Sequence, residues 1–227
     1  MATELIDWDG AYREEGIFVG PPPWNIGEPQ PAFMGLINEG RIRGDVLDAG
    51  CGHAELSLTL AAKGHTVVGV DLSRAAIDTA TATAKSRGIV NATFLCADIT
   101  SLTGFDDRFS TLMDSTLFHS LPVESRDAYL RAMYRAARPG ASFFVLVFAH
   151  GAFPDDFTVP INAVTEDELR AAVSKYWTVD EINPASIHAL AGQVHGDGEA
   201  VPMPQLATDE KGRLIFPAYL LSAHKSA

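Results

Sequence analysis

The strongest constraint on this chain is an apolar strand pattern that ends in a glycine turn, DVLDAGCG at residues 45–52. Gly50 and Gly52 permit a tight turn, and a helical pattern follows from His53 to Lys63. The chain then repeats this order of a short β-rich run and a longer helical run. Such alternation is typical of βα units that feed a parallel sheet. The sequence therefore predicts an α/β fold with a doubly wound, mostly parallel sheet.

The pattern predicts seven strands and the helices between them. The expected strands are 45–50, 66–71, 92–98, 109–114, 141–148, 178–182 and 216–223. After the first helix, the expected helices are a segment capped by Ser73 that runs to Arg87, then 124–137 and 166–175, with a further helical turn at 31–39.

We expect one domain over residues 1–227, because a chain of this length buries one sizeable core. Residues 1–44, which are rich in proline, should wrap the domain as a lid, and 45–150 should form its cofactor-binding core. Residues 183–215 show little periodicity, so they are predicted to be a long insertion that covers the acceptor site.

The charge of the chain excludes several classes of partner. A formal net charge of −12 disfavours nucleic acids and acidic membranes, which are bound mainly through Lys and Arg. The first ten residues lack the basic and apolar regions of a signal peptide, so a cytoplasmic location is expected. The seven histidines show no paired metal-ligand spacing, and no metal site is predicted.

Four aspartates end the first four predicted strands. They are Asp48, Asp71, Asp98 and Asp114. The carboxyl ends of parallel strands meet at one edge of a sheet, so these side chains should line one crevice. Asp48 would face an ammonium or sulfonium group, Asp71 two ribose hydroxyls, and Asp98 an adenine amino group.

Neighbouring residues complete this predicted pocket. Leu72 would flank the adenine, and the backbone N–H of Ile99 would face a ring nitrogen. A dinucleotide would instead call for a third glycine where this chain has Glu55, and its diphosphate would lie close to Asp48. The carboxylates thus favour S-adenosylmethionine over NAD or FAD.

The motifs VLDAGCG, VVGVD, CADI and RAARPGASFFVLVF resemble those of class I S-adenosylmethionine-dependent methyltransferases, over residues 45–148. The segment PPWNIGEPQPAF resembles the entry of the thiopurine, thiol and halide methyltransferases, which implies that Trp24 lies against the cofactor. The overall pattern is similar to mycobacterial heterocyclic-toxin methyltransferases. These resemblances imply a seven-stranded Rossmann-like sheet with its last strand antiparallel, and detoxifying O-methylation of a hydroxyquinolone-like acceptor.

A hydroxyl acceptor reacts better once its proton is lost, and histidine is the side chain suited to that step near neutrality. His119 follows the fourth predicted strand and His150 the fifth, so both are candidate general bases, with His119 preferred. The side chains expected to line a flat acceptor pocket are Phe18, Phe118, Tyr176, Trp177 and His188.

Three other functions stay open at this point. Methylation of a thiol or halide would need no general base for an anionic acceptor. A nicotinamide oxidoreductase is disfavoured by Asp48 and Glu55. A non-catalytic protein that retains S-adenosylmethionine is compatible with the same motifs. The partner is a small molecule in each case, and the chain is expected to be a monomer or a homodimer.

Overall fold

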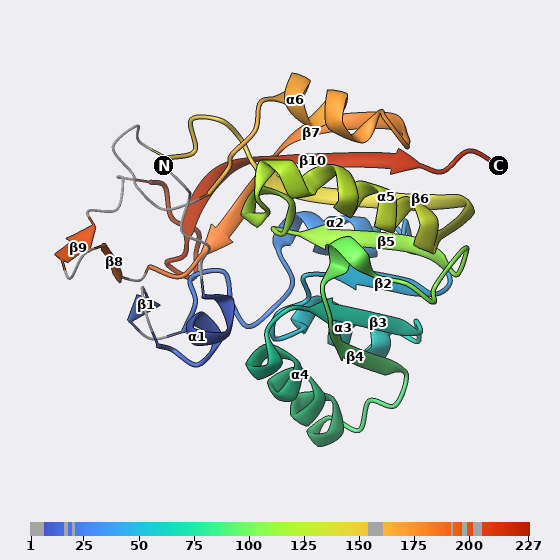
Figure 1. Cartoon of the computed structure of the whole chain (residues 1–227). Helices are drawn as coiled ribbons and strands as arrows, with labels where there is room; N and C mark the ends of the chain where they lie inside the picture. Colours follow the sequence, from blue (N-terminus) through green and yellow to red (C-terminus); the bar gives the residue numbers. More distant parts are fainter. Residues whose placement is uncertain are drawn as a thin grey trace.

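The computed structural model describes residues 7–15, 18–19, 21–153, 161–191, 193–196, 199–201 and 206–227. Its centre is a seven-stranded sheet with the order β4-β3-β2-β5-β6-β10-β7 and with helices on both faces (Figure 1). Strands β2 to β6 pair in parallel, and β10 is antiparallel to both β6 and β7. The predicted α/β class and the antiparallel last strand are confirmed.

The first four strands of this sheet lie where the sequence predicts them, and the fifth begins four residues before the predicted start at 141. They are β2 (Val46–Ala49), β3 (Val67–Asp71), β4 (Ala92–Cys96), β5 (Phe109–Ser115) and β6 (Ala137–Phe148). Every residue of β2 and β3 is buried, as expected of central parallel strands covered on both faces. These two strands therefore read as apolar runs with one polar residue near the carboxyl end, Asp48 in β2 and Asp71 in β3.

The helices form two layers against the sheet. One layer holds α2 (Pro31–Asn38), α3 (Glu55–Ala62) and α4 (Arg74–Ser86), and the other holds α5 (Arg126–Ala136) and α6 (Glu166–Val173). The predicted cap Ser73 accepts a hydrogen bond from the backbone N–H of Ala76. Short 3-10 turns follow β4 (Ile99–Ser101) and β5 (Phe118–Ser120), and another, Val123–Ser125, precedes α5.

The expected insertion begins later than predicted. Residues 183–189 belong to β7 (Thr178–Ala189), and β10 (Leu214–His224) begins two residues before the predicted strand. Pro184 made this stretch read as irregular, but β7 is the last strand of the sheet, and proline is tolerated in an edge strand. The connection between the two strands therefore covers only residues 190–213.

A second, three-stranded sheet joins this connection to the start of the chain. It contains β1 (Phe18–Val19), β8 (Gln193–Gly196) and β9 (Glu199–Val201), and it lies beside α1 (Trp8–Tyr12) at one end of the main sheet (Figure 1). Among the described residues, no helix has the length and apolar character needed to cross a membrane.

The N-terminal segment, residues 7–30, is fixed to the sheet at both of its ends. Asp9 of α1 accepts hydrogen bonds from the Ser73 hydroxyl and from the Ala75 N–H at the start of α4. At the other end, the side-chain amide of buried Gln30 donates to the carbonyl of His188 in β7 and accepts from its N–H, at 2.9 and 2.8 Å. The segment therefore spans the sheet edge from α4 to β7.

We predict that Gln30→Ala destabilises the protein by about 1–3 kcal/mol, because it leaves the buried N–H and C=O of His188 unpaired. Urea unfolding monitored by circular dichroism measures this change. The exposed Asn38, at the end of α2, provides the control, since Asn38→Ala should change stability by less than about 0.5 kcal/mol. Equal stabilities of the two variants would contradict the role of Gln30.

Candidate functional site

A cavity of about 800 Å³ opens at the carboxyl ends of the parallel strands. Its walls come from the N-terminal segment, from the turns after β2, β3, β4 and β5, and from the ends of β6, β7 and β10. We call the part over β4, β3 and β2 the acidic compartment and the part over β5, β6, β10 and β7 the aromatic compartment. None of the described residues that line the cavity is Lys or Arg.

Asp48 and Asp71 form the floor of the acidic compartment. Asp48 is buried on β2 and accepts a hydrogen bond from the Ser57 hydroxyl at 2.6 Å. Burial raises the pKa of Asp48 to about 6 and also raises the pKa of Asp71. A cation placed here would favour the ionised form of both carboxyls.

The carboxylate of Asp71 holds the glycine turn against the sheet. Its two oxygens accept from the backbone N–H groups of Gly52 and Ser73, each at 2.9 Å. A carboxylate has about four lone-pair sites, so these backbone bonds leave room for a ligand. The predicted contact with ribose hydroxyls is therefore compatible with these backbone bonds.

Gly52 is required by the close approach of Tyr12. Gly52 has a φ of 52°, and a Cβ at this position would lie 2.5 Å from the Tyr12 hydroxyl. That hydroxyl accepts from Trp24 Nε1 at 3.1 Å, and the Trp24 ring makes edge contacts with Trp8 and Tyr12. The glycine turn thus makes room for an aromatic side chain of the N-terminal segment.

His53, directly after the glycine turn, carries a hydrogen-bond donor without a partner. Asn25 Nδ2 lies 2.8 Å from His53 Nδ1. An amide nitrogen only donates, so Nδ1 is the acceptor and the proton of the neutral ring lies on Nε2. Nε2 is buried and has no hydrogen-bond partner among the described residues. His53 lines the cavity beside Tyr12, and the centroids of the two rings lie 5.1 Å apart.

The outer end of the acidic compartment contains the remaining residues predicted for the nucleoside. Asp98, Ile99 and Leu72 all line the cavity, and Leu72 is 63% exposed there. Asp98 Oδ1 accepts from the N–H and hydroxyl of Thr100, which leaves Oδ2 open to a ligand. An exposed leucine at a cavity wall offers an apolar surface for a flat ring.

Asp114 does not line the cavity, contrary to the sequence prediction. Its side chain is fully buried below the turn that follows β5. One oxygen accepts from the N–H groups of Leu117 and Phe118, and the other accepts from the Tyr129 hydroxyl at 2.7 Å. Asp114 therefore fixes this turn, in which Thr116 has the unfavourable φ of 79° for a β-branched residue.

The aromatic compartment combines one imidazole with a cluster of phenylalanines. Ring centroids of Phe148, Phe153 and Phe216 lie 4.8–5.5 Å apart, and His119 lies 4.4 Å from Phe148. Ile161 and Asn162 line the same region. The compartment suits a flat apolar ligand with one polar group near His119.

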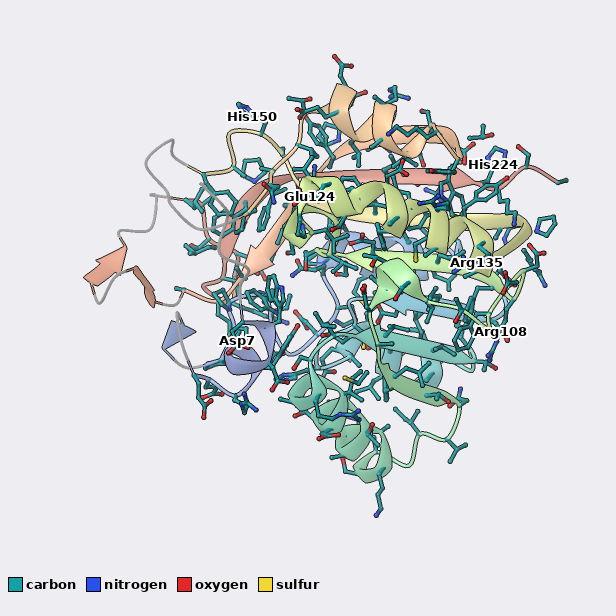
Figure 2. All side chains as sticks on the ribbon, viewed as in Figure 1. Asp7, Arg108, Glu124, Arg135, His150 and His224 are labelled. Atoms are coloured by element: carbon teal, nitrogen blue, oxygen red, sulfur yellow. The ribbon has the colours of Figure 1, made fainter. Side chains whose placement is uncertain are left out.

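The structure places His150 away from the cavity. Its side chain is exposed in the loop after β6 and lies on the outer surface of the molecule (Figure 2). Strand β6 ends at Phe148, and it is Phe148 that lines the cavity. The sequence prediction of His150 as a general base is therefore wrong, because two further residues carry the chain out of the site.

Four of the five residues predicted to bind the acceptor lie elsewhere, and the side chain of Phe18 lies outside the described residues. Trp177 is core, packed on Phe143 and Tyr134, and the Tyr176 hydroxyl donates to Asp127 of α5. Phe118 is buried under the Arg126 guanidinium, and His188 bonds to Asp209 and Ser186. Strands β7 and β10 instead contribute Ile187, Ala189 and Phe216 to the cavity.

Several cavity residues were missed by sequence reasoning. They are Asn25, which lies inside the segment PPWNIGEPQPAF but was not singled out, and His53, Asn162 and Phe216, which lie far apart in the sequence. The one available signal was His53, which directly follows the glycine turn. The others depend on how the N-terminal segment and β10 return to the sheet edge.

The acidic compartment fits S-adenosylmethionine. Two buried carboxyls and the absence of Lys and Arg from the described lining suit a sulfonium and an ammonium group, and disfavour a diphosphate. The unpaired Nε2–H of His53 and the Tyr12 hydroxyl would hold the carboxylate of the amino-acid part. Burial raises the pKa of Tyr12 well above its usual value, so this hydroxyl keeps its proton as a donor.

Comparison with known proteins gives consistent relatives. Residues 46–140 match the family described as a methyltransferase domain. The chain is 47% identical to a 2-heptyl-1-hydroxyquinolin-4(1H)-one methyltransferase of Mycobacteroides abscessus, covering 99% of this chain and 100% of the relative. It is 26% identical to thiocyanate methyltransferase 1 of Brassica oleracea, over 82% and 80% of the two chains.

A solved structure gives the same picture. It comes from a study of the conversion of a disulfide bond into a thioacetal group during echinomycin biosynthesis. Its chain is 33% identical, with a TM-score of 0.80, over 100% of this chain and 93% of that one.

We predict that His53→Ala weakens the binding of S-adenosylhomocysteine on the order of 10-fold or more, because a donor to a carboxylate is lost. Isothermal titration calorimetry measures the affinity. 5′-Methylthioadenosine, which lacks the amino-acid part, serves as the control and should bind both proteins alike. Equal losses for the two ligands would show that His53 does not face the carboxylate.

The pKa of Asp114, raised to about 7 by burial, makes stability depend on pH. The folded protein binds this proton more tightly than the unfolded chain, so its contribution is complete below about pH 4 and is lost as pH rises through 7. We expect wild type to lose roughly 2–4 kcal/mol more than Asp114→Asn between pH 5 and pH 8. Urea unfolding at each pH tests this, and parallel curves would contradict it. The titration of Asp48 is common to wild type and Asp114→Asn, so it cancels in the difference between them.

Proposed function

Because this chain belongs to the S-adenosylmethionine-dependent methyltransferase family, we propose that it methylates a hydroxyl oxygen on a small aromatic heterocycle. The cofactor supplies a methyl group that is already activated on a sulfonium. The protein therefore has to bind both partners, align the acceptor oxygen with the methyl group, and exclude water. An N-hydroxyquinolone is the acceptor class that we favour.

The main support for this proposal is that the acidic and aromatic compartments belong to one continuous cavity. The acidic compartment suits a cationic amino-acid nucleoside, and the aromatic compartment opens directly beside it. Phe148, Phe153 and Phe216 offer ring faces and edges to a flat acceptor. Thiol or halide acceptors are small and would leave this aromatic surface unfilled. The name of the relative from Mycobacteroides abscessus supports the same acceptor class.

We further propose that the cavity is covered by the N-terminal segment together with the connection 190–213. Four contacts support this: the pairing of β1 with β8, the bond from Leu190 N to Pro23 O at 2.7 Å, the Gln30 amide on β7, and the ion pairs of Glu28 with Lys211 and Arg213. Trp24 and Tyr12 then contact the cofactor from the lid side. A heterocyclic toxin methylated here would lose a reactive hydroxyl, which is the detoxification that we propose for the cytoplasm.

Transfer of a labelled methyl group across a panel of acceptors tests the function. We expect kcat/KM for an alkylated N-hydroxyquinolone to exceed that for an alkyl thiol or thiocyanate on the order of 100-fold or more, because only the heterocycle fills the aromatic compartment. Phenols and unsubstituted quinolones complete the panel. Faster turnover of a thiol or halide than of every heterocycle would overturn the proposal and restore that alternative.

A further inference from the structure

The hydrogen bonds of His119 fix which of its nitrogens carries a proton. The backbone N–H of Phe148 donates to His119 Nδ1 at 3.2 Å. A backbone amide only donates, so the lone pair of Nδ1 is already used and the neutral ring has its proton on Nε2. Nε2 has no hydrogen-bond partner among the residues that the structure describes, and the His119 side chain lines the aromatic compartment.

The surroundings of His119 keep the ring neutral. The side chain is only 3% exposed, and the guanidinium of Arg126 on α5 adds a nearby positive charge. Burial and, second, Arg126 lower the pKa of His119 to about 3. Asp114, on β5 beneath the same turn, is bound to Tyr129 and two backbone N–H groups. A ring in this setting is a poor proton acceptor at neutral pH.

The other ionisable groups around the cavity are placed away from this role. Glu28 is paired with Lys211 and Arg213, and Glu55 with Arg87. The remaining acidic side chains of the described lining are Asp48, Asp71 and Asp98, which belong to the acidic compartment, and Glu124, which is exposed. The other imidazole of the lining, His53, belongs to the acidic compartment, where its Nδ1 accepts from Asn25. The uncharged polar side chains of the aromatic compartment are not bases at physiological pH; they are Ser115, Thr116, Ser120, Ser125 and Asn162.

We propose that His119 donates a hydrogen bond from Nε2 to an acceptor oxygen that is already ionised, so that the enzyme selects acidic hydroxyl groups and removes no proton itself. This inference rests on the proposed function and narrows its substrate class to acceptors that ionise in solution. The oxyanion forms the new O–CH₃ bond as the S–CH₃ bond breaks. The electron pair of the broken bond stays on sulfur, and both opposite charges disappear without a base.

The test uses the binding of an N-hydroxyquinolone, whose neutral and ionised forms differ in absorbance, to protein saturated with S-adenosylhomocysteine. One pH unit below the pKa of the acceptor, we expect the bound spectrum to be that of the anion. Below that pKa, Kd should rise about tenfold per pH unit, since only the ionised fraction binds. A neutral bound spectrum would overturn the proposal and restore His119 as a base.

Two variants separate donation from proton removal. His119→Asn can accept from the Phe148 N–H and still present an amide N–H to the acceptor, whereas His119→Phe presents no donor. We expect His119→Asn to retain anion binding and His119→Phe to lose it on the order of 10- to 100-fold. Unchanged affinity for S-adenosylhomocysteine shows that each variant is folded. Equal losses in both variants would overturn the donor role.

Turnover distinguishes this inference from the proposed function. Across ring-substituted acceptors, the acidic limb of kcat/KM against pH should move with the pKa of the acceptor. A limb that stays in place, with methyl transfer intact, overturns the inference and leaves the function standing. If the protein binds the anion but transfers no methyl group, the donor role of His119 stands and the proposed hydroxyl methylation is overturned.

Discussion

The site depends on the common direction of the five parallel strands. Because β2 to β6 all point the same way, their carboxyl ends and following turns meet at one edge of the sheet. Side chains from residues 48 to 148 thereby reach a single cavity. The antiparallel β10 and its neighbour β7 extend the edge and supply the aromatic wall. Acidic and aromatic surfaces are adjacent because the strands that carry them are adjacent.

Two buried carboxyls near this edge, Asp48 and Asp114, differ in what they contact. Asp48 lines the cavity, and burial raises its pKa. It forms no ion pair with any residue that the structure describes, so a bound cation would stabilise its charge. Asp114 is one strand away and never reaches the cavity, but it holds the turn that presents Leu117 and His119. Both carboxyls lie near the end of a central strand. Their side chains point in different directions, so Asp48 can contact a ligand and Asp114 can only hold the turn.

The βα order, the glycine turn and the acidic compartment were predictable because each depends on local spacing along consecutive strands. Asp48, Asp71 and Asp98 needed only the rule that parallel strand ends meet. The prediction for His150 was wrong because a periodic pattern does not show at which residue the chain leaves the end of a strand. Tyr176, Trp177 and Phe118 failed because an aromatic side chain reads alike in a core and in a pocket. The protonated nitrogen of His119 depends on a backbone N–H from another strand, which no sequence pattern reveals.

The amide of Gln30 has a consequence beyond holding the N-terminal segment. It hydrogen-bonds to the N–H and C=O of His188 that point away from β10. The Gln30 side chain thus makes the two bonds that a neighbouring strand would make on the outer edge of β7. An uncovered edge strand of twelve residues offers a template for pairing with another chain. Gln30, which also lines the cavity, therefore leaves no free N–H or C=O at His188 with which another chain could pair.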